Sequence, residues 1–303
     1  MRAFLVVLLM SGCATTRQGT FDAIVLGASG GIDESDLTSV WLSRAGKGEW
    51  VAFDAGTVVA GLRRAHALGA FGSTRPSEVF SKHLHGVFLS HPHLDHVAGL
   101  ILSSPEAPKV SVFGLAPTLD ALAQHVFGSP LWANFTDEGT GAIGRFHLVR
   151  MTAGEAVQSA AGFSVEAFEL SHGPTTSTAF LACVPEGECA LYLGDTGPDA
   201  VEKSERLKTL WARVKERCVR VIFIEVSFAD PREDSKLFGH LTPRWLISEL
   251  SALDVKGLNI VVTHIKPGVD GSDVRELISN QLEPLRTRGA TVIVPRAGEL
   301  RSF

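Results

Sequence analysis

The sequence predicts a layered α/β protein in which helices cover the faces of sheets. Short apolar runs recur along the chain with turn residues between them, which is the pattern of buried strands. Stretches with helical spacing and good helix formers separate several of these runs. A chain of 303 residues with 45% hydrophobic residues has ample material for a packed core. We therefore expect a layered α/β domain with one hydrophobic core on each sheet face.

The expected elements follow from these patterns. The strands are expected at residues 21–27, 50–56, 85–91, 110–114, 163–170, 178–183, 189–195, 221–227, 258–264 and 291–295, and the helices at residues 199–217, 243–253 and 271–288. No internal repeat, low-complexity tract or long linker interrupts this series. Residues 21–303 are therefore expected to form one domain.

The first residues have the order of an export signal. Arg2 precedes an apolar run over residues 3–10, and small residues follow it. The run is too short to cross a bilayer, which takes ~20 residues. The triplet Ser11-Gly12-Cys13 resembles a bacterial lipobox, whose cysteine becomes the lipidated N-terminus, although Met10 stands where leucine is usual. An ordinary signal peptide is the alternative.

We therefore expect a signal peptide of the lipoprotein type over residues 1–12 and a lipidated tether over residues 13–20. The expected location is the periplasm or the cell surface of a bacterium, and the lipid on Cys13 is the expected membrane contact. Export also permits disulfides. Cys183 and Cys189 flank a turn-like VPEGE between two apolar runs, so they are either bridged across a hairpin or two buried thiols.

The charge pattern narrows the class of partner. The formal net charge is −5, and no basic stripe or run of like charges occurs. Binding of long nucleic acids usually needs such a stripe. We therefore expect a small-molecule substrate; the sequence leaves the oligomeric state open.

The most informative stretch is LSHPHLDHVAGL at residues 89–100, which places His91, His93, Asp95 and His96 within six positions. It joins an expected buried strand to an expected helix, so the four side chains lie in a turn with His96 at the helix start. Imidazoles and a carboxylate suit Zn²⁺ or a similar divalent ion. One ion cannot easily take all four ligands, which favours two adjacent ions.

Such a pair of ions needs ligands from elsewhere, and three candidates occur where an apolar run ends. His172 follows FSVEAFEL, Asp195 follows CALYLG, and His264 follows NIVVT. A carboxylate such as Asp195 can bridge two ions, while His172 and His264 would each complete one. Taken singly, each histidine could be an ordinary polar residue at a strand end, and Asp195 could be a turn residue. The HPHLDH cluster favours the ligand interpretation for all three.

With these motifs, the sequence resembles the metallo-β-lactamase-fold hydrolases, which carry HxHxDH followed by separate His, Asp and His motifs. More narrowly, HPHLDHVAGLILSSP is similar to the motif of class II 3′,5′-cyclic-nucleotide phosphodiesterases, and LGASGG, FDAGT, IEVSF, FGHLTP and THIKP agree with that family. The resemblance covers nearly the whole mature chain. It implies a four-layer αββα sandwich with two metals at the sheet edges.

The resemblance also assigns roles to residues. It implies that His91, His93 and His172 bind one metal, that Asp95, His96 and His264 bind the other, and that Asp195 bridges them. Asp54 in FDAGT would support the ligands from behind, although an Asp-Gly turn is the alternative. His240 and Glu225 resemble the histidine–glutamate pair of tRNA 3′-processing endonucleases, in which the carboxylate orients a proton-donating imidazole. Asp95 is counted with His240 and Glu225 among the catalytic residues.

These assignments predict a hydrolase of 3′,5′-cyclic nucleotides (cyclic AMP, with cyclic GMP as a second substrate left open) that forms nucleoside 5′-monophosphates by attack of a metal-bridging hydroxide. Two divalent ions are expected, Zn²⁺ first, with Mn²⁺ or Fe²⁺ as alternatives. Another dinuclear hydrolase of the same fold, acting on a linear phosphodiester, a lactone, a thioester or a β-lactam, is the competing interpretation. A second competing interpretation is a metal-binding or nucleotide-binding protein without turnover. His66, His83, His85, His125 and His147 lie in no comparable motif.

Overall fold

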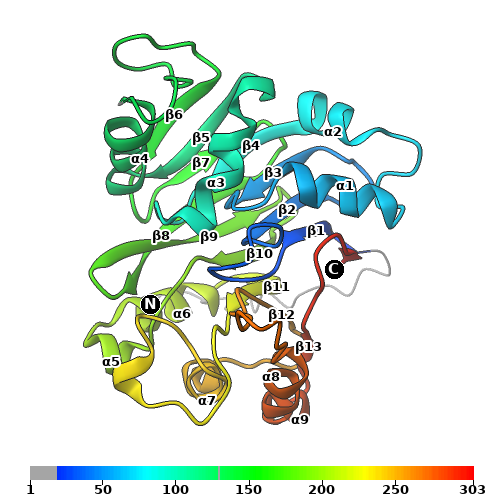
Figure 1. The fold of residues 1–303 in the computed structure, drawn as a ribbon. Coiled ribbons are helices and arrows are strands. Elements are labelled where there is room, and N and C mark those ends of the chain that lie inside the picture. Colours follow the sequence, from blue (N-terminus) through cyan, green and yellow to red (C-terminus); the bar gives the residue numbers. More distant parts are fainter. Residues whose placement is uncertain (1–18, 129) are drawn as a thin grey trace, which may run out of the picture.

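The computed structural model describes residues 19–128 and 130–303, and in this part of the chain two sheets of seven strands each form the centre of the molecule (Figure 1). The first sheet has the order β14–β1–β2–β3–β4–β5–β6 and the second the order β13–β12–β11–β10–β9–β8–β7. The strands of the first sheet are β1 (Phe21–Gly27), β2 (Ser39–Arg44), β3 (Trp50–Phe53), β4 (Leu84–Phe88), β5 (Val110–Leu115), β6 (Phe146–Met151) and β14 (Leu300–Ser302). Those of the second are β7 (Ala156–Gln158), β8 (Ser164–His172), β9 (Thr175–Cys183), β10 (Glu188–Leu193), β11 (Cys218–Glu225), β12 (Asn259–Thr263) and β13 (Thr291–Ile293).

Helices cover the outer face of each sheet, as Figure 1 shows above and below the strands. Over the first sheet lie α1 (Val59–Ala67), α2 (Pro76–His83), α3 (Leu94–Ser103) and α4 (Ala116–Leu122). The second sheet is followed along the chain by α5 (Asp199–Glu202), α6 (Arg206–Val214), α7 (Pro243–Glu249), α8 (Arg275–Gln281) and α9 (Glu283–Thr287). Short helical turns are η1 (Ser104–Glu106), η2 (Ala123–Phe127), η3 (Asp234–Lys236) and η4 (Leu250–Ala252).

Three hydrophobic clusters fill the spaces between these layers. The alternation of side chains along β11 shows why: Val221 and Phe223 face the other sheet, whereas Ile222 and Ile224 face the helices. One cluster lies between the two sheets, and one lies between each sheet and its helices. The expected layered α/β domain, and the four-layer αββα sandwich implied by the resemblance, are confirmed.

Two expected helices differ from the structure. Residues 199–217 form α5 and α6, because Lys203 between them adopts left-handed backbone angles (φ 53°, ψ 47°). The Asp199 carboxylate accepts backbone hydrogen bonds from Leu207 and Lys208 at the start of α6. The helix expected over residues 271–288 begins only at Arg275 and is interrupted before Pro284, which has no N–H group to continue it.

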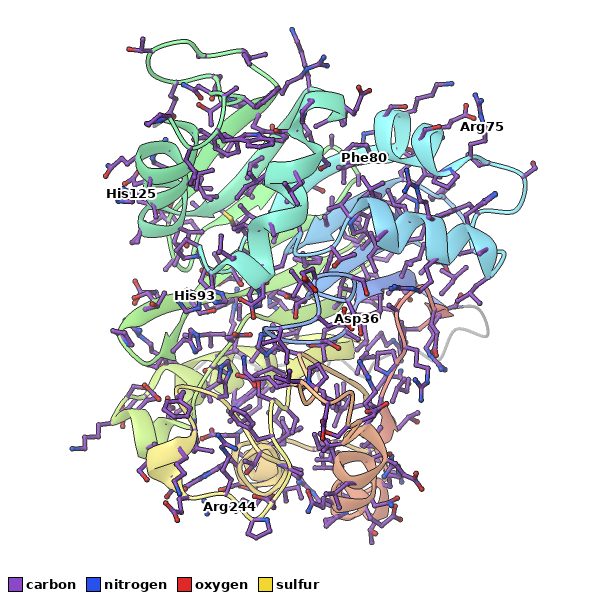
Figure 2. The ribbon with its side chains drawn as sticks, viewed as in Figure 1. Asp36, Arg75, Phe80, His93, His125 and Arg244 are labelled. Atoms are coloured by element: carbon purple, nitrogen blue, oxygen red, sulfur yellow. A yellow bond between two sulfur atoms is a disulfide. The ribbon has the colours of Figure 1, made fainter. Side chains whose placement is uncertain are left out.

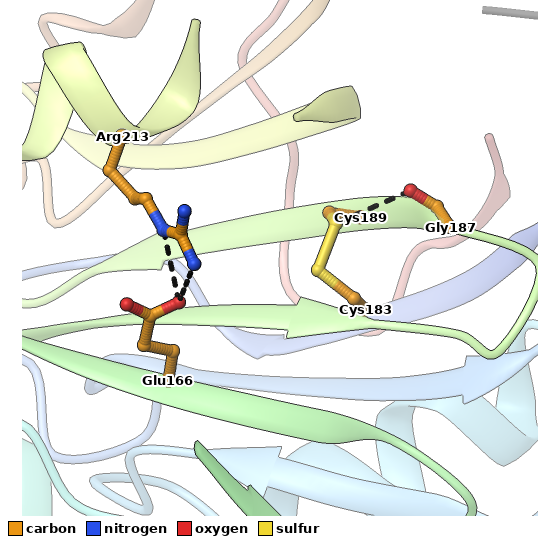
Figure 3. Close-up of a disulfide and its surroundings, with 5 residues drawn as sticks. All are labelled: Glu166, Cys183, Gly187, Cys189 and Arg213. Atoms are coloured by element: carbon orange, nitrogen blue, oxygen red, sulfur yellow. Dashed lines mark hydrogen bonds and ion pairs between the residues drawn. A yellow bond between two sulfur atoms is a disulfide. The ribbon is translucent and has the colours of Figure 1, made fainter. Parts of the chain in front are cut away.

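Cys183 and Cys189 are the last residue of β9 and the second of β10, and they lie directly opposite each other in the antiparallel register. They form a disulfide, so the bridged alternative holds (Figure 3). The same view shows Arg213 of α6 bound to Glu166 of β8, which joins a helix to the sheet beneath it.

In the described residues, we find no helix with the length and apolar character that a membrane crossing requires. The predicted signal peptide at residues 1–12 lies outside the described residues. Of the predicted tether at residues 13–20, residues 13–18 also lie outside them. The domain boundary at residue 21 stays a prediction.

Candidate metal centre

The HPHLDH stretch forms the turn that the sequence predicts. Strand β4 ends at Phe88 and helix α3 begins at Leu94, so His91 and His93 lie in the loop while Asp95 and His96 lie in the first turn of α3. His91 and His96 are fully buried, whereas His93 is exposed. In Figure 2, His93 lies between helix α3 and the green and yellow segments of the second half of the chain.

The three distant candidates lie at the ends of strands in the second sheet. His172 is the last residue of β8, Asp195 follows β10 by two residues, and His264 directly follows β12. Strands β10 and β12 run parallel to β11 between them, so their carboxyl ends meet at one edge of the sheet. This edge brings all three side chains to the HPHLDH turn.

The seven residues form two adjoining groups. Potential ligand atoms of His91, His93 and His172 lie within 4.8 Å of one another, and the same holds for Asp95, His96, Asp195 and His264. The structure thus has the grouping that the sequence predicts. Their role as metal ligands stays a prediction, since it follows from this geometry and not from a bound ion.

Asp195 lies between the two groups. Its Oδ2 is 3.8 Å from Nε2 of His91, 3.8 Å from Nε2 of His172 and 3.1 Å from Nε2 of His264. Its Oδ1 is 3.3 Å from Nε2 of His96. The two oxygens together approach imidazoles of both groups, which is the position of a bridging ligand.

The donor set fits divalent ions. The Nε2 atoms of His91 and His96 are buried and have no hydrogen-bond partner within the described residues, although buried polar atoms are normally paired. Burial, together with the neighbouring His96, holds the pKa of His91 well below its usual range, so this imidazole is neutral, which is the form that binds metals. Unpaired imidazole nitrogens beside carboxylates are suitable donors for Zn²⁺ and similar ions.

Hydrogen bonds from the far side of the rings fix four of the five imidazoles. In each of the four, Nδ1 has a partner outside the cluster, so Nε2 faces the cluster. The partners are Ser90 Oγ for His91 (2.9 Å), Asp54 Oδ2 for His96 (2.7 Å), the Gly239 carbonyl for His172 (2.8 Å) and Ser227 Oγ for His264 (2.9 Å). His93 is the more exposed and less constrained member, with its Nδ1 3.3 Å from Nε2 of His172.

Asp54 has the supporting position that the resemblance implies. It is fully buried, with left-handed backbone angles (φ 54°). Its Oδ1 accepts from the Ser90 backbone, while its Oδ2 accepts from the Ser90 hydroxyl, the His96 ring and the Tyr192 hydroxyl (2.6 Å). Asp54 is therefore a hydrogen-bonded buried carboxylate and not a solvent-facing turn residue.

His240 and Glu225 form a pair beside the cluster. His240 Nδ1 lies 2.8 Å from Glu225 Oε1, and the His240 ring lies 5.2 Å from the His264 ring. Glu225 is buried and also accepts from the backbones of Thr196, Ser227 and Leu241. Glu225 thus faces the protein interior.

The electrostatics of this pair favour a charged imidazole. Burial lowers the pKa of His240, but the charge and the hydrogen bond of Glu225 outweigh it, so the pKa lies above its usual value. Burial raises the pKa of Glu225, but His240 more than offsets it and the carboxyl stays ionised. A protonated His240 can donate a proton.

Among the remaining histidines, those with a described partner contact ordinary polar groups outside the cluster. His83 and His85 both contact Glu49, and His147 contacts Asp137. The residues that the sequence did not single out are Ser90, Ser227, Tyr192 and Gly239, each a hydrogen-bond partner of a site residue. Ser90, Ser227 and Gly239 lie within or beside a motif, and this proximity was their only signal in the sequence. Tyr192 lies inside an apolar strand, and nothing in the sequence singled it out.

Comparisons with known proteins agree with this fold and site. Residues 71–298 match the model of the family described as cAMP phosphodiesterases class-II. The chain is 35% identical to a probable 3′,5′-cyclic-nucleotide phosphodiesterase of Yersinia pestis, over 98% of this chain and 94% of that protein. It is 36% identical to a 3′,5′-cyclic-nucleotide phosphodiesterase of Aliivibrio fischeri, over 95% and 94% of the two chains.

Solved structures show the same architecture. The unliganded yeast PDE1 structure superposes with a TM-score of 0.82 at 25% identity, covering 94% of this chain and 100% of that one. The metallo-beta-lactamase fold protein YhfI from Bacillus subtilis superposes with a TM-score of 0.63 at 14% identity, covering 93% and 99%. The molecule is thus a hydrolase of the metallo-β-lactamase fold with a histidine–aspartate centre. Within that class, the chain belongs to the class-II cAMP phosphodiesterases.

Proposed function

We propose that this protein hydrolyses 3′,5′-cyclic nucleotides to nucleoside 5′-monophosphates. Membership of the class-II family supports the substrate class. The observation that carries the reaction is the position of His240, which buried Glu225 holds beside the histidine–aspartate cluster. Ions held by the cluster would supply activated water and the pair can supply a proton, and ring opening of a cyclic phosphodiester needs both.

The proposed cofactor is a pair of divalent ions. His91, His93 and His172 would hold the first, Asp95, His96 and His264 the second, and Asp195 both. The imidazole-rich donor set favours Zn²⁺, and Mn²⁺ or Fe²⁺ accept the same ligands. Such ions lower the pKa of water and neutralise charge on phosphoryl oxygens.

His240 is the proposed proton donor. Its Nδ1 donates to Glu225, so its Nε2 is directed away from that carboxylate. As the water-derived oxygen bonds to phosphorus, the bond from phosphorus to the 3′ oxygen breaks. His240 then gives its Nε2 proton to that leaving oxygen, and Glu225 stabilises the charged imidazole until the proton is lost.

A product assay tests this proposal. Purified protein loaded with Zn²⁺ or Mn²⁺ is incubated with 3′,5′-cyclic AMP and with 3′,5′-cyclic GMP, and the products are separated by chromatography. We expect 5′-monophosphates and little turnover of a lactone, a β-lactam or a linear phosphodiester in parallel incubations. Binding of cyclic AMP without product over hours, or faster turnover of any of the other three, contradicts the proposal.

We also propose that the protein is exported and anchored through a lipid on Cys13. The order of residues 1–13 supports this, and so does the Cys183–Cys189 disulfide, because such bonds persist mainly in oxidising compartments. Fractionation of bacteria expressing the full chain should place it with the membranes, and Cys13→Ser should release it to the soluble fraction. If Cys13→Ser is divided between the membrane and soluble fractions in the same way as the parent chain, the lipid anchor is rejected.

A further inference from the structure

Two buried serines connect imidazoles of the centre to buried carboxylates. Ser90 Oγ lies 2.9 Å from His91 Nδ1 and 2.7 Å from Asp54 Oδ2. Ser227 Oγ lies 2.9 Å from His264 Nδ1 and 2.8 Å from Glu225 Oε2. Both serines are 0% exposed, so water does not compete for these hydrogen bonds. The two halves of the molecule therefore contain the same arrangement, imidazole to serine to carboxylate.

The chemistry of the groups sets the direction of each chain of hydrogen bonds. A hydroxyl has one proton to donate and can accept two hydrogen bonds, whereas an ionised carboxylate only accepts. Each serine must therefore donate to its carboxylate and accept from the imidazole; for Ser227 the His264 carbonyl, at 3.2 Å, is a more distant second acceptor than Glu225. The imidazole then carries its proton on Nδ1, and the lone pair of its Nε2 faces the cluster.

We propose that Ser90 and Ser227 are positioning residues that fix His91 and His264 in the tautomer and orientation needed to bind metal. This inference rests on the proposed metal centre. The carboxylates also hold a second imidazole directly: Asp54 holds His96 and Glu225 holds His240. Both imidazoles linked to Asp54 belong to the cluster, whereas Glu225 is shared between a ligand and the proton donor.

This difference predicts different phenotypes for the two serines. Loss of the Ser90 hydroxyl affects ligand orientation alone, so excess metal should restore turnover. Loss of the Ser227 hydroxyl also removes one hydrogen bond from the carboxylate that orients His240. Turnover should then stay low even when the centre is saturated with metal.

The experiment compares Ser90→Ala and Ser227→Ala with Ser177→Ala in the full chain. Ser177 is a matched control: it is 0% exposed, its Oγ has no hydrogen-bond partner within the described residues, and it lies near Ser90 across Gly194. The readouts are Zn²⁺ affinity from competition with a chromophoric chelator, and kcat and KM for cyclic AMP at saturating Zn²⁺.

We expect Ser90→Ala and Ser227→Ala to bind Zn²⁺ about 10- to 100-fold more weakly than the parent protein, as is usual when the hydrogen-bond partner of a ligand is lost. Ser177→Ala should keep the parent affinity. At saturating Zn²⁺, Ser90→Ala should regain parental kcat, while Ser227→Ala should show a reduced kcat at unchanged KM. Matching circular-dichroism spectra and cooperative unfolding of the metal-free proteins confirm that the fold is intact.

Parental Zn²⁺ affinity in both serine variants overturns the inference, as does an equal loss in Ser177→Ala. This outcome is distinct from failure of the proposed function. If the parent turns over cyclic AMP but the serine variants keep their affinity, the positioning role alone is wrong. If the parent lacks turnover and the variants lose affinity, the proposed reaction alone is wrong.

Discussion

Asp195 contacts more members of the centre than any other side chain described. Two imidazoles of each group lie within 3.8 Å of its carboxylate oxygens: His91 and His172, and His96 and His264. Burial raises its pKa, but His264 and His96 outweigh this and hold the pKa well below its usual value. The carboxylate is therefore ionised and directed at both groups.

Replacing Asp195 tests the shared ligand. Asp195→Ala should abolish turnover and lower the content of bound metal, because both ions lose a ligand and the surrounding imidazoles lose a negative charge. Metal analysis of the purified variant beside the parent measures the effect. A variant that retains two equivalents of metal argues against a bridging carboxylate.

Replacing His240 tests the proton donor. His240→Ala should retain the parental metal content while kcat falls by about 10²- to 10⁴-fold, the usual contribution of general acid catalysis. Steady-state kinetics and metal analysis of one preparation give both quantities. If the inactive variant has also lost its metal, His240 is a ligand and not the donor.

The pairing of His240 with Glu225 predicts a pH effect. Because the carboxylate raises the pKa of His240, the proton is present below this raised pKa and is lost as pH rises through it. Glu225→Gln removes the negative charge, so the His240 pKa should fall and the alkaline limb of the kcat profile should move to lower pH. Profiles measured at saturating metal test this, and an unmoved or upward-shifted limb contradicts it.

At the scale of elements, opposite ends of the same strands serve different purposes. Strand β8 ends at His172, and the carboxyl end of β10 leads to Asp195. The amino end of β10 instead carries Cys189 of the Cys183–Cys189 disulfide. The bridge closes a short hairpin that contributes no residue to the centre. Its effect on the molecule should therefore be on stability and not on chemistry.

Removal of this disulfide tests that separation. The double variant Cys183→Ala and Cys189→Ala should lose about 2 kcal/mol of unfolding free energy, the loop-closure entropy of a bridge spanning so few residues. Turnover at 25 °C should be unchanged. Urea unfolding gives the free energy, and a folded double variant with greatly reduced turnover would show that the hairpin affects the centre.

At the scale of the whole molecule, the centre joins the two halves of the sandwich. The HPHLDH turn follows strand β4 of the first sheet, whereas His172 ends β8 and Asp195 and His264 follow β10 and β12 of the second. The space between the sheets is filled by aromatic rings, and Tyr192 lies there 5.4 Å from the Phe53 ring while its hydroxyl contacts Asp54. Packing between the sheets thereby sets the position of the centre.

Metal removal should therefore destabilise the whole molecule. Each ion that binds only the folded protein stabilises it by about 4 kcal/mol when its free concentration is 1,000 times Kd, which for a chain of this size raises Tm by roughly 6 °C per ion. Calorimetry before and after exhaustive chelation measures the shift, and re-addition of Zn²⁺ should reverse it. An unchanged Tm would mean that the ligand groups are equally well held without metal.

The fold was predictable where buried strands are continuous apolar runs. VIFIEVS contains the carboxyl-terminal part of β11 and LNIVVTH contains all of β12, since strands covered on both faces need apolar side chains at most positions. Strand β2, SVWLSR, was missed although five of its six residues are buried, because serine and arginine conceal the pattern. Burial of polar residues depends on what packs over them, which local sequence does not specify.

The candidate site shows the same division. By itself, the sequence determined the kinds of candidate ligand and their order, since HPHLDH and the strand-end residues predict metal chemistry through residue type and spacing. Only the tertiary structure decided which hydrogen-bond partner each imidazole has: Ser90 for His91, Asp54 for His96, Ser227 for His264. A ligand is recognisable from its own chemistry, whereas orientation of its ring depends on atoms that the packing of two sheets brings from distant segments.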